Sequence, residues 1–115
     1  MQTQTIPPEQ WRTKLNKLSQ SFEGWLVSLD VIAQPDGPPL REFRKIPLLG
    51  ITAEPEGPIV ISVAEVTGEH VTHIIRSPTR VLLDKTDSGA NAALEIESAD
   101  GMKAVLRFRT TGVEH

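Results

Sequence analysis

The spacing of apolar side chains changes at Gly24, and this change decides which class of fold the chain can adopt. Before Gly24, apolar residues recur at the intervals of one helix face, as Trp11, Leu15, Leu18 and Phe22. After Gly24, apolar residues recur at every second position, the period of a strand, as Trp25, Val27, Leu29 and Val31. The sequence therefore predicts one amphipathic helix followed by strands.

The helix has recognisable ends. Pro7 and Pro8 suit a first helical turn because their missing N–H groups would have no partner there. Gly24 suits the left-handed position that follows a helix. Residues 1–6 show no pattern that would hold them in place, so we predict that they are disordered. We expect a single domain over residues 7–112 and a short tail over residues 113–115.

Past Gly24, short strands alternate with turns rich in glycine and proline, and we count six to seven strands. Short connections exclude parallel crossovers, so the strands should form an antiparallel meander. The expected fold class is α+β, with the N-terminal helix packed on a curved sheet. Both an open sheet and a small closed barrel fit the sequence. Pro47 and Pro78 are predicted to interrupt strands or to lie at sheet edges.

The last two predicted strands form a hairpin whose register can be worked out from its residues. A three-residue loop ending in a left-handed Gly101 places Leu94 beside Leu106 and Glu97 opposite Lys103. A two-residue loop would set apolar side chains against charged ones. We therefore predict the three-residue loop.

Composition excludes several classes of function. Twelve basic and fifteen acidic residues are interspersed, and the net charge of −3 supplies no strong field for nucleic acid. Zero cysteines exclude thiolate nucleophiles, iron–sulfur clusters and most structural zinc sites. No signal peptide or stretch of about 20 apolar residues is visible. We expect a soluble cytoplasmic protein that needs no cofactor and contacts no membrane.

Three blocks of sequence together resemble a family of small bacterial proteins classed only as a domain of unknown function. The blocks are residues 46–51 (IPLLGI), 73–81 (HIIRSPTRV) and 94–101 (LEIESADG). The resemblance implies a shared compact fold rich in β-structure. It implies no activity, cofactor or catalytic residue.

One candidate site surrounds the second proline-containing bend. Two arginines and two hydroxyl groups there could hold a phosphate or carboxylate, with a further arginine from a neighbouring strand. These residues are Arg76, Ser77, Thr79, Arg80 and Arg44. The competing interpretation is that the arginines are solvated and protect a sheet edge.

A second candidate is the pair His70 and His73, with Glu69 as an acid. Two histidines three residues apart can share a metal ion on a helix, but on a strand they point to opposite sides. The surrounding β-branched residues favour a strand, and hence histidines that are structural or simply exposed.

No carboxylate pair or serine is placed for catalysis, so we do not expect an enzyme. The leading hypothesis is a noncatalytic binding module that meets a protein partner, or a second copy of itself, through a sheet edge or face. The expected contact lies near Pro47 or Pro78. A binder of small anions through Arg76 and Arg80 is the second hypothesis. A metal-assisted hydrolase using His70 and His73 is the third.

Overall fold

The structure is a computed structural model that describes residues 2–33, 37–54, 57–65 and 67–108. Within these residues the chain forms one short 3-10 turn, one α-helix and eight strands. The elements are β1 (Gln2–Ile6), η1 (Pro8–Gln10), α1 (Trp11–Phe22), β2 (Leu26–Ile32), β3 (Leu40–Ala53), β4 (Ile59–Ala64), β5 (His70–Ile75), β6 (Pro78–Lys85), β7 (Asn91–Ser98) and β8 (Lys103–Phe108). None of the described helices is long and apolar enough to span a membrane.

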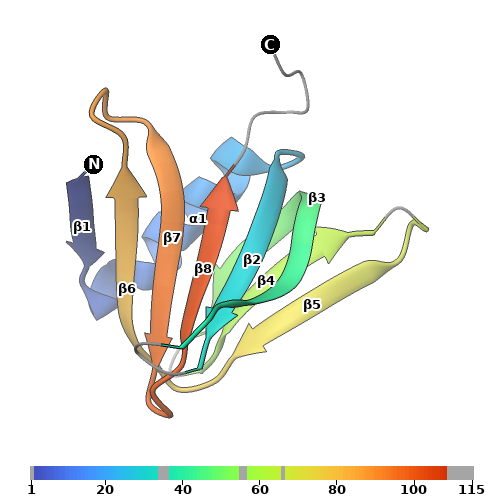
Figure 1. Cartoon of the computed structure of the whole chain (residues 1–115). Helices are drawn as coiled ribbons and strands as arrows, with labels where there is room; N and C mark the ends of the chain where they lie inside the picture. The colour runs from blue at the N-terminus through green and yellow to red at the C-terminus, as the bar shows by residue number, and fades with distance from the viewer. Residues whose placement is uncertain (1, 34–36, 55–56, 66, 109–115) are drawn as a thin grey trace.

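The strands form one curved antiparallel sheet in the order β1-β6-β7-β8-β2-β3-β4-β5 (Figure 1). The α+β class is confirmed, but the predicted strand count of six to seven is wrong because the described sheet has eight. The sheet is open: β1 and β5 are its two ends in this order, so it is not a barrel. Only Arg76 and Ser77 separate β5 from β6, the neighbour of β1, so β5 lies close to the other side of the sheet at this corner.

Gln2–Ile6, expected to be disordered, instead forms β1. It pairs antiparallel with β6, and its last residue, Ile6, is only 2% exposed. Thr3 Oγ1 donates a hydrogen bond to Asp84 Oδ1 at 2.8 Å, and Trp11 Nε1 donates one to the Ile6 carbonyl at 2.8 Å. The partner strand lies about 80 residues further along the chain, so the local sequence holds no signal for the pairing.

Pro47 does not interrupt its strand, contrary to the expectation from sequence. It lies inside β3, at the point where the strand changes partners. The first half of β3 pairs with β2 as far as Pro47, and the second half pairs with β4 from Leu48 onward. Because the proline stands where the β2 pairing ends, its missing N–H costs little, and the Leu48 N–H donates to the Trp25 carbonyl at 2.8 Å.

The helix contributes to one core with the inner face of the sheet. Its predicted apolar stripe is buried at Leu15, Leu18 and Phe22. These side chains share a cluster with inward-facing residues of the strands that α1 crosses in Figure 1. Gly24 follows the helix with φ +85°, the conformation expected for a residue that ends one.

The predicted register of the last hairpin is confirmed. Leu94 pairs with Leu106 and Glu97 pairs with Lys103. Gly101 has φ +87° and donates its N–H to the Ser98 carbonyl at 3.0 Å, closing the three-residue loop. The predicted tail over residues 113–115 lies outside the described residues.

Candidate functional site

The structure separates the residues of the predicted anion site. Arg80 lies on the outer face of β6, with its Nη1 3.7 Å from Glu97 Oε2, and Thr79 Oγ1 donates to the Glu97 carbonyl at 3.2 Å. Arg44 is on β3, four strands from β6, which is roughly 19 Å at the usual spacing of about 4.8 Å. Arg44 and Arg80 therefore do not face a common ligand.

The other two residues of the predicted anion site, Ser77 and Arg76, line different hollows. Ser77 adopts φ +51°, a conformation that non-glycine residues rarely adopt, and its carbonyl accepts the Ala99 N–H at 3.0 Å. This bond ties the β5–β6 bend to the β7–β8 turn. Ser77 lines a hollow beside Trp11, whereas Arg76 lines a different one beside β5. No observation favours a shared anion site over separate structural roles.

His70 and His73 lie on opposite faces of β5, as expected for a strand. His73 pairs with Ile61, a fully buried core residue, and points inward, whereas His70 is exposed on the outer face. Within the described ranges, no three His, Cys, Asp or Glu side chains gather closely enough to hold a metal ion.

A charged network that the sequence analysis missed covers the outer face of the sheet. Asp30, 5% exposed, lies between two arginines: Arg41 Nε and Nη2 donate to its carboxylate at 2.6 and 3.1 Å, and Arg107 Nε lies 3.6 Å away. The hydrogen bonds from Arg41 are the main reason that the pKa of Asp30 lies below its ordinary value. The alternation of side chains along the strand predicts that Asp30 points outward. It does not predict the two arginines beside Asp30, because they come from two other strands.

The same face carries a pair of acids beside a lysine. A hydrogen bond with Asp84 raises the pKa of Glu95, and partial burial adds to this rise. Lys103 Nζ, 2.6 Å from Glu95 Oε1, acts in the opposite direction. These groups lie on an open sheet face, and none of them lines the hollows described here. We assign the network to holding neighbouring strands together.

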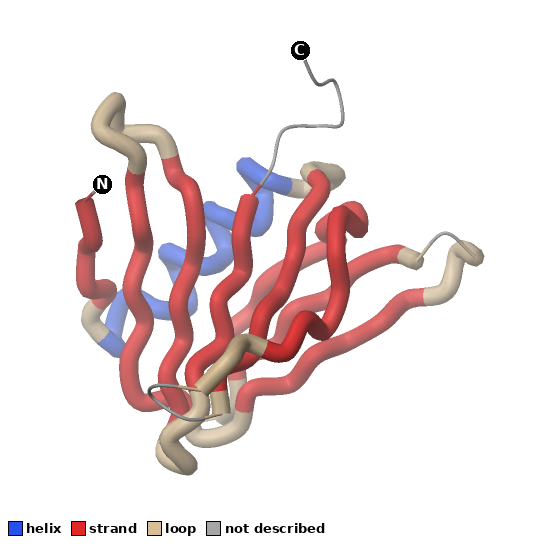
Figure 2. The backbone as a smooth tube through the Cα atoms, in the orientation of Figure 1, coloured by secondary structure: helices blue, strands red, loops and turns tan. Residues whose placement is uncertain are grey.

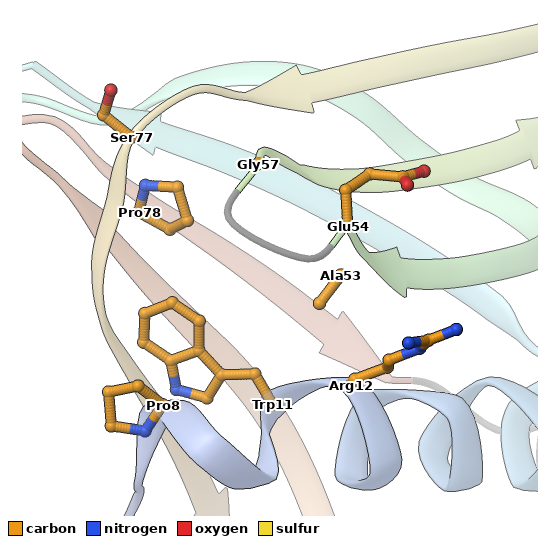
Figure 3. A pocket seen from close by; sticks show the side chains of 8 residues that line it. All are labelled: Pro8, Trp11, Arg12, Ala53, Glu54, Gly57, Ser77 and Pro78. Carbon is orange, nitrogen blue, oxygen red and sulfur yellow. The ribbon is translucent and has the colours of Figure 1, made fainter.

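An open trough runs between the start of α1 and the β3–β4 turn (Figure 3). One part, about 340 Å³, is walled by Pro8, Trp11 and Pro78. It adjoins a second part of about 650 Å³, and both are lined by Arg12 and Glu54. In Figure 3 the side chains of Arg12 and Glu54 extend away from Trp11, so this first part of the trough offers mainly an apolar wall. The second part is also lined by Thr13, Asn16 and Thr52.

The free edges of the sheet differ in how well they are protected. A free edge invites pairing with another chain, and proteins usually block it with charges, proline or bulges. The first half of β3, which pairs only with β2, carries Arg41, Glu42, Arg44 and Lys45. It also has register shifts and a left-handed Lys45 with φ +52°. This edge is well protected.

β5 lies at one end of the sheet and has none of these protections. β1, at the opposite end, also lacks charges, but its exposed residues are all polar. The six residues of β5, His70–Ile75, contain no lysine, arginine, acid, glycine or proline. They pair with β4 without any register shift. Among the described strands, none lies along its other side (Figure 2). β5 is therefore a straight edge with no charged residue in it.

The register of the β4–β5 hairpin shows which backbone groups of β5 face this free side. The Glu65 N–H donates to the Glu69 carbonyl at 2.8 Å, so these two residues form a hydrogen-bonded pair. Hydrogen-bonded and non-hydrogen-bonded pairs alternate along an antiparallel ladder. Every second residue of β5 therefore turns its N–H and C=O away from β4. These residues are His70, Thr72 and Ile74.

Exposed apolar surface gathers beside the same edge. Ile74 is 45% exposed and Met102, in the β7–β8 turn, is 37% exposed. Both line a hollow of about 130 Å³ between the end of β5 and that turn, together with His73 and Arg76. The hollow has room for one apolar side chain, and Arg76 is exposed at this end of the strand.

The fold and these edges define a class: a small α+β domain with an open antiparallel sheet, an uncharged end strand that exposes an apolar side chain, and no assembled reactive group among the described residues. The chain belongs to a family of unknown function, DUF5335, whose model matches residues 2–112. The three blocks that resembled a domain of unknown function all lie within this match. No curated protein and no solved structure matches the chain.

Proposed function

We propose that this protein is a noncatalytic binding module that takes up an extended segment of a protein partner as an added strand along β5. The single observation behind this proposal is the unprotected edge of β5. Exposed edges are normally blocked, and the first half of β3 in the same molecule is blocked by charges and a bulge. β1, the other end of the sheet, is uncharged as well, but its exposed residues are all polar, so β5 is the end strand that combines missing charge with an exposed apolar side chain. We take this combination as a sign that the edge is used.

The contacts available at β5 match the known chemistry of strand addition. Backbone hydrogen bonds supply affinity that does not depend on the partner's sequence, while side-chain pockets supply selectivity. His70, Thr72 and Ile74 offer the backbone groups, and the hollow beside Ile74 and Met102 offers the pocket. The absence of cysteine suits a reducing compartment, so we place this activity in the bacterial cytoplasm.

The test uses two variants of the edge and one control. Thr72→Pro removes a donor that faces the free side without removing a bond to β4, so the fold should persist. Ile74→Lys places a charge on the same edge. Leu40→Lys is the matched control, because Leu40 is an exposed apolar residue (62%) on a different strand.

Proteins from the source cell that bind the immobilised chain are recovered, and their affinity for each purified variant is measured by calorimetry. We expect the Leu40→Lys variant to bind like the unmodified chain and both edge variants to lose binding. A partner that binds the Thr72→Pro variant with unchanged affinity would show that β5 is not the contact.

A further inference from the structure

We infer that the segment added to β5 is β5 of a second copy of this chain, paired antiparallel about a two-fold axis at Thr72. This inference rests on the proposed function, because it names the occupant of the same edge. It makes a specific assembly: two sheets joined edge to edge into one continuous sheet.

The position of the axis follows from the backbone. In a symmetric antiparallel pairing, the residue on the axis meets itself. If that residue is Thr72, His70 of each copy meets Ile74 of the other, and all three outward-facing residues of both copies are paired. Each such pair exchanges two hydrogen bonds, so three pairs give about six bonds. An axis at His70 or Ile74 would leave most of these groups unpaired.

Side chains at this register are compatible. Thr72 meets Thr72 of the second copy, and Val71 meets His73. Threonine pairs and pairs of β-branched with ring side chains are favourable across antiparallel strands. No residue of β5 carries a formal charge at neutral pH with histidine uncharged, so no like charges are opposed within the strand.

Charges just outside the strand favour the same arrangement. Glu69 precedes β5 and Arg76 follows it, and both are exposed. Antiparallel pairing brings the beginning of one strand beside the end of the other. Glu69 of each copy then lies at the same end of the pairing as Arg76 of the other, twice by symmetry. A parallel pairing would bring like charges together instead.

A hollow borders one end of the position that the second strand would take. The end of β5 approaches the β7–β8 turn, and the hollow of about 130 Å³ separates them beside Ile74, His73 and Met102. His70 of the second copy, which meets Ile74, lies next to this hollow. Pairing would also cover the exposed side chain of Ile74.

Disulfide trapping can test the register directly because the chain contains no cysteine. Residues in a hydrogen-bonded antiparallel pair have Cα atoms about 5.5 Å apart, within the range that a disulfide spans. Thr72→Cys should form a covalent dimer on mild oxidation. Thr52→Cys, at an exposed strand threonine away from β5, is the control and should form no disulfide-linked dimer. His70→Cys and Ile74→Cys should cross-link when mixed but not alone.

Light scattering over a concentration series gives an independent measurement. The unmodified chain should form dimers whose fraction rises with concentration, and the Thr72→Pro variant should remain monomeric with an unchanged tryptophan emission spectrum. Arg76→Glu should weaken the dimer about fivefold, because it replaces attraction with repulsion between the exposed charges at each end of the pairing. Glu69→Arg combined with Arg76→Glu should restore it.

The outcomes separate this inference from the proposed function. A chain that stays monomeric, with no more cross-linking at Thr72→Cys than at Thr52→Cys, overturns self-pairing. If that chain still binds a cellular partner and loses it on Thr72→Pro, the proposed function stands. A dimer that persists unchanged in the Thr72→Pro and Ile74→Lys variants would place the interface elsewhere and overturn the inference.

Discussion

Alanine at Gly50 tests how closely α1 approaches β3. A Cβ atom added at Gly50 would lie 3.2 Å from Ser19 Oγ, with no other atom within 4 Å. The same oxygen accepts the Ile51 N–H at 3.0 Å. Ile51 is fully buried, so water cannot replace this acceptor. We expect Gly50→Ala to displace the hydroxyl and weaken this hydrogen bond.

The magnitude can be worked out from these contacts. Leaving a buried N–H without its acceptor costs about 1–3 kcal/mol. Ser19→Ala should have this cost, reduced by about 0.5 kcal/mol because alanine has the better helix propensity. Gly50 has no positive φ, so alanine there also stabilises by about 0.4–1 kcal/mol through the unfolded chain. Gly50→Ala alone should therefore destabilise by about 0.5–2 kcal/mol. In a Ser19→Ala background it should stabilise instead, by about 0.4–1 kcal/mol.

The assay is urea unfolding of all four proteins, followed by the fluorescence of Trp11 and Trp25. Independent substitutions add to within about 0.5 kcal/mol, so the predicted change of sign lies well outside additivity. The helix-propensity contribution of Ser19→Ala is common to both arms and cancels. If Gly50→Ala had the same effect in both backgrounds, Ser19 would not limit the approach of helix to strand, and this account would be refuted.

Two further substitutions test other contacts. Asp30→Asn should lower the urea midpoint at pH 7. The pKa of Asp30 is depressed in the folded chain, so its contribution is present above its ordinary value near 3.8 and disappears as pH falls through the folded value. The difference between the two proteins should therefore close at acidic pH, and a gap that stays constant from pH 7 to pH 3 would contradict the ion pairs. Trp11→Phe removes the bond from the indole N–H to the Ile6 carbonyl. It should speed hydrogen exchange in residues 2–6 relative to β7, as measured by mass spectrometry, and unchanged exchange would show that Trp11 does not anchor β1.

The parts of the fold that follow from local patterns could be predicted from the sequence. The helix stripe ending at Phe22, its termination at Gly24, and the Leu94–Leu106 register each depend on neighbouring residues or on one tight turn. The face alternation that separates His70 from His73 is equally local. In each case a short-range rule is sufficient, because no distant segment changes the outcome.

The predictions that were wrong, and the contacts that were missed, depend on partners distant in sequence. β1 is a polar segment, and it becomes a strand only because β6 and the Trp11 side chain hold it. Pro47 is a strand breaker unless the strand changes partners at that residue, which requires knowing where β2 ends. Asp30 likewise gains its two arginines from strands on either side, β3 and β8. Periodicity carries no information on which strands become neighbours.

The candidate edge combines both kinds of information. The lack of charge, proline and bulge in His70–Ile75 is visible in the sequence, but the same residues would be unremarkable in a central strand. It is the sheet order, with β4 on one side of β5 and no described strand on the other, that turns an ordinary apolar segment into an exposed one. The charges of Arg76 and Arg80 led to the prediction of a site at the neighbouring bend, but the uncharged strand before it is the better candidate for binding. In a β domain, a search for binding edges should therefore compare the free edges with one another, because the meaning of an unprotected strand depends on how the others are protected.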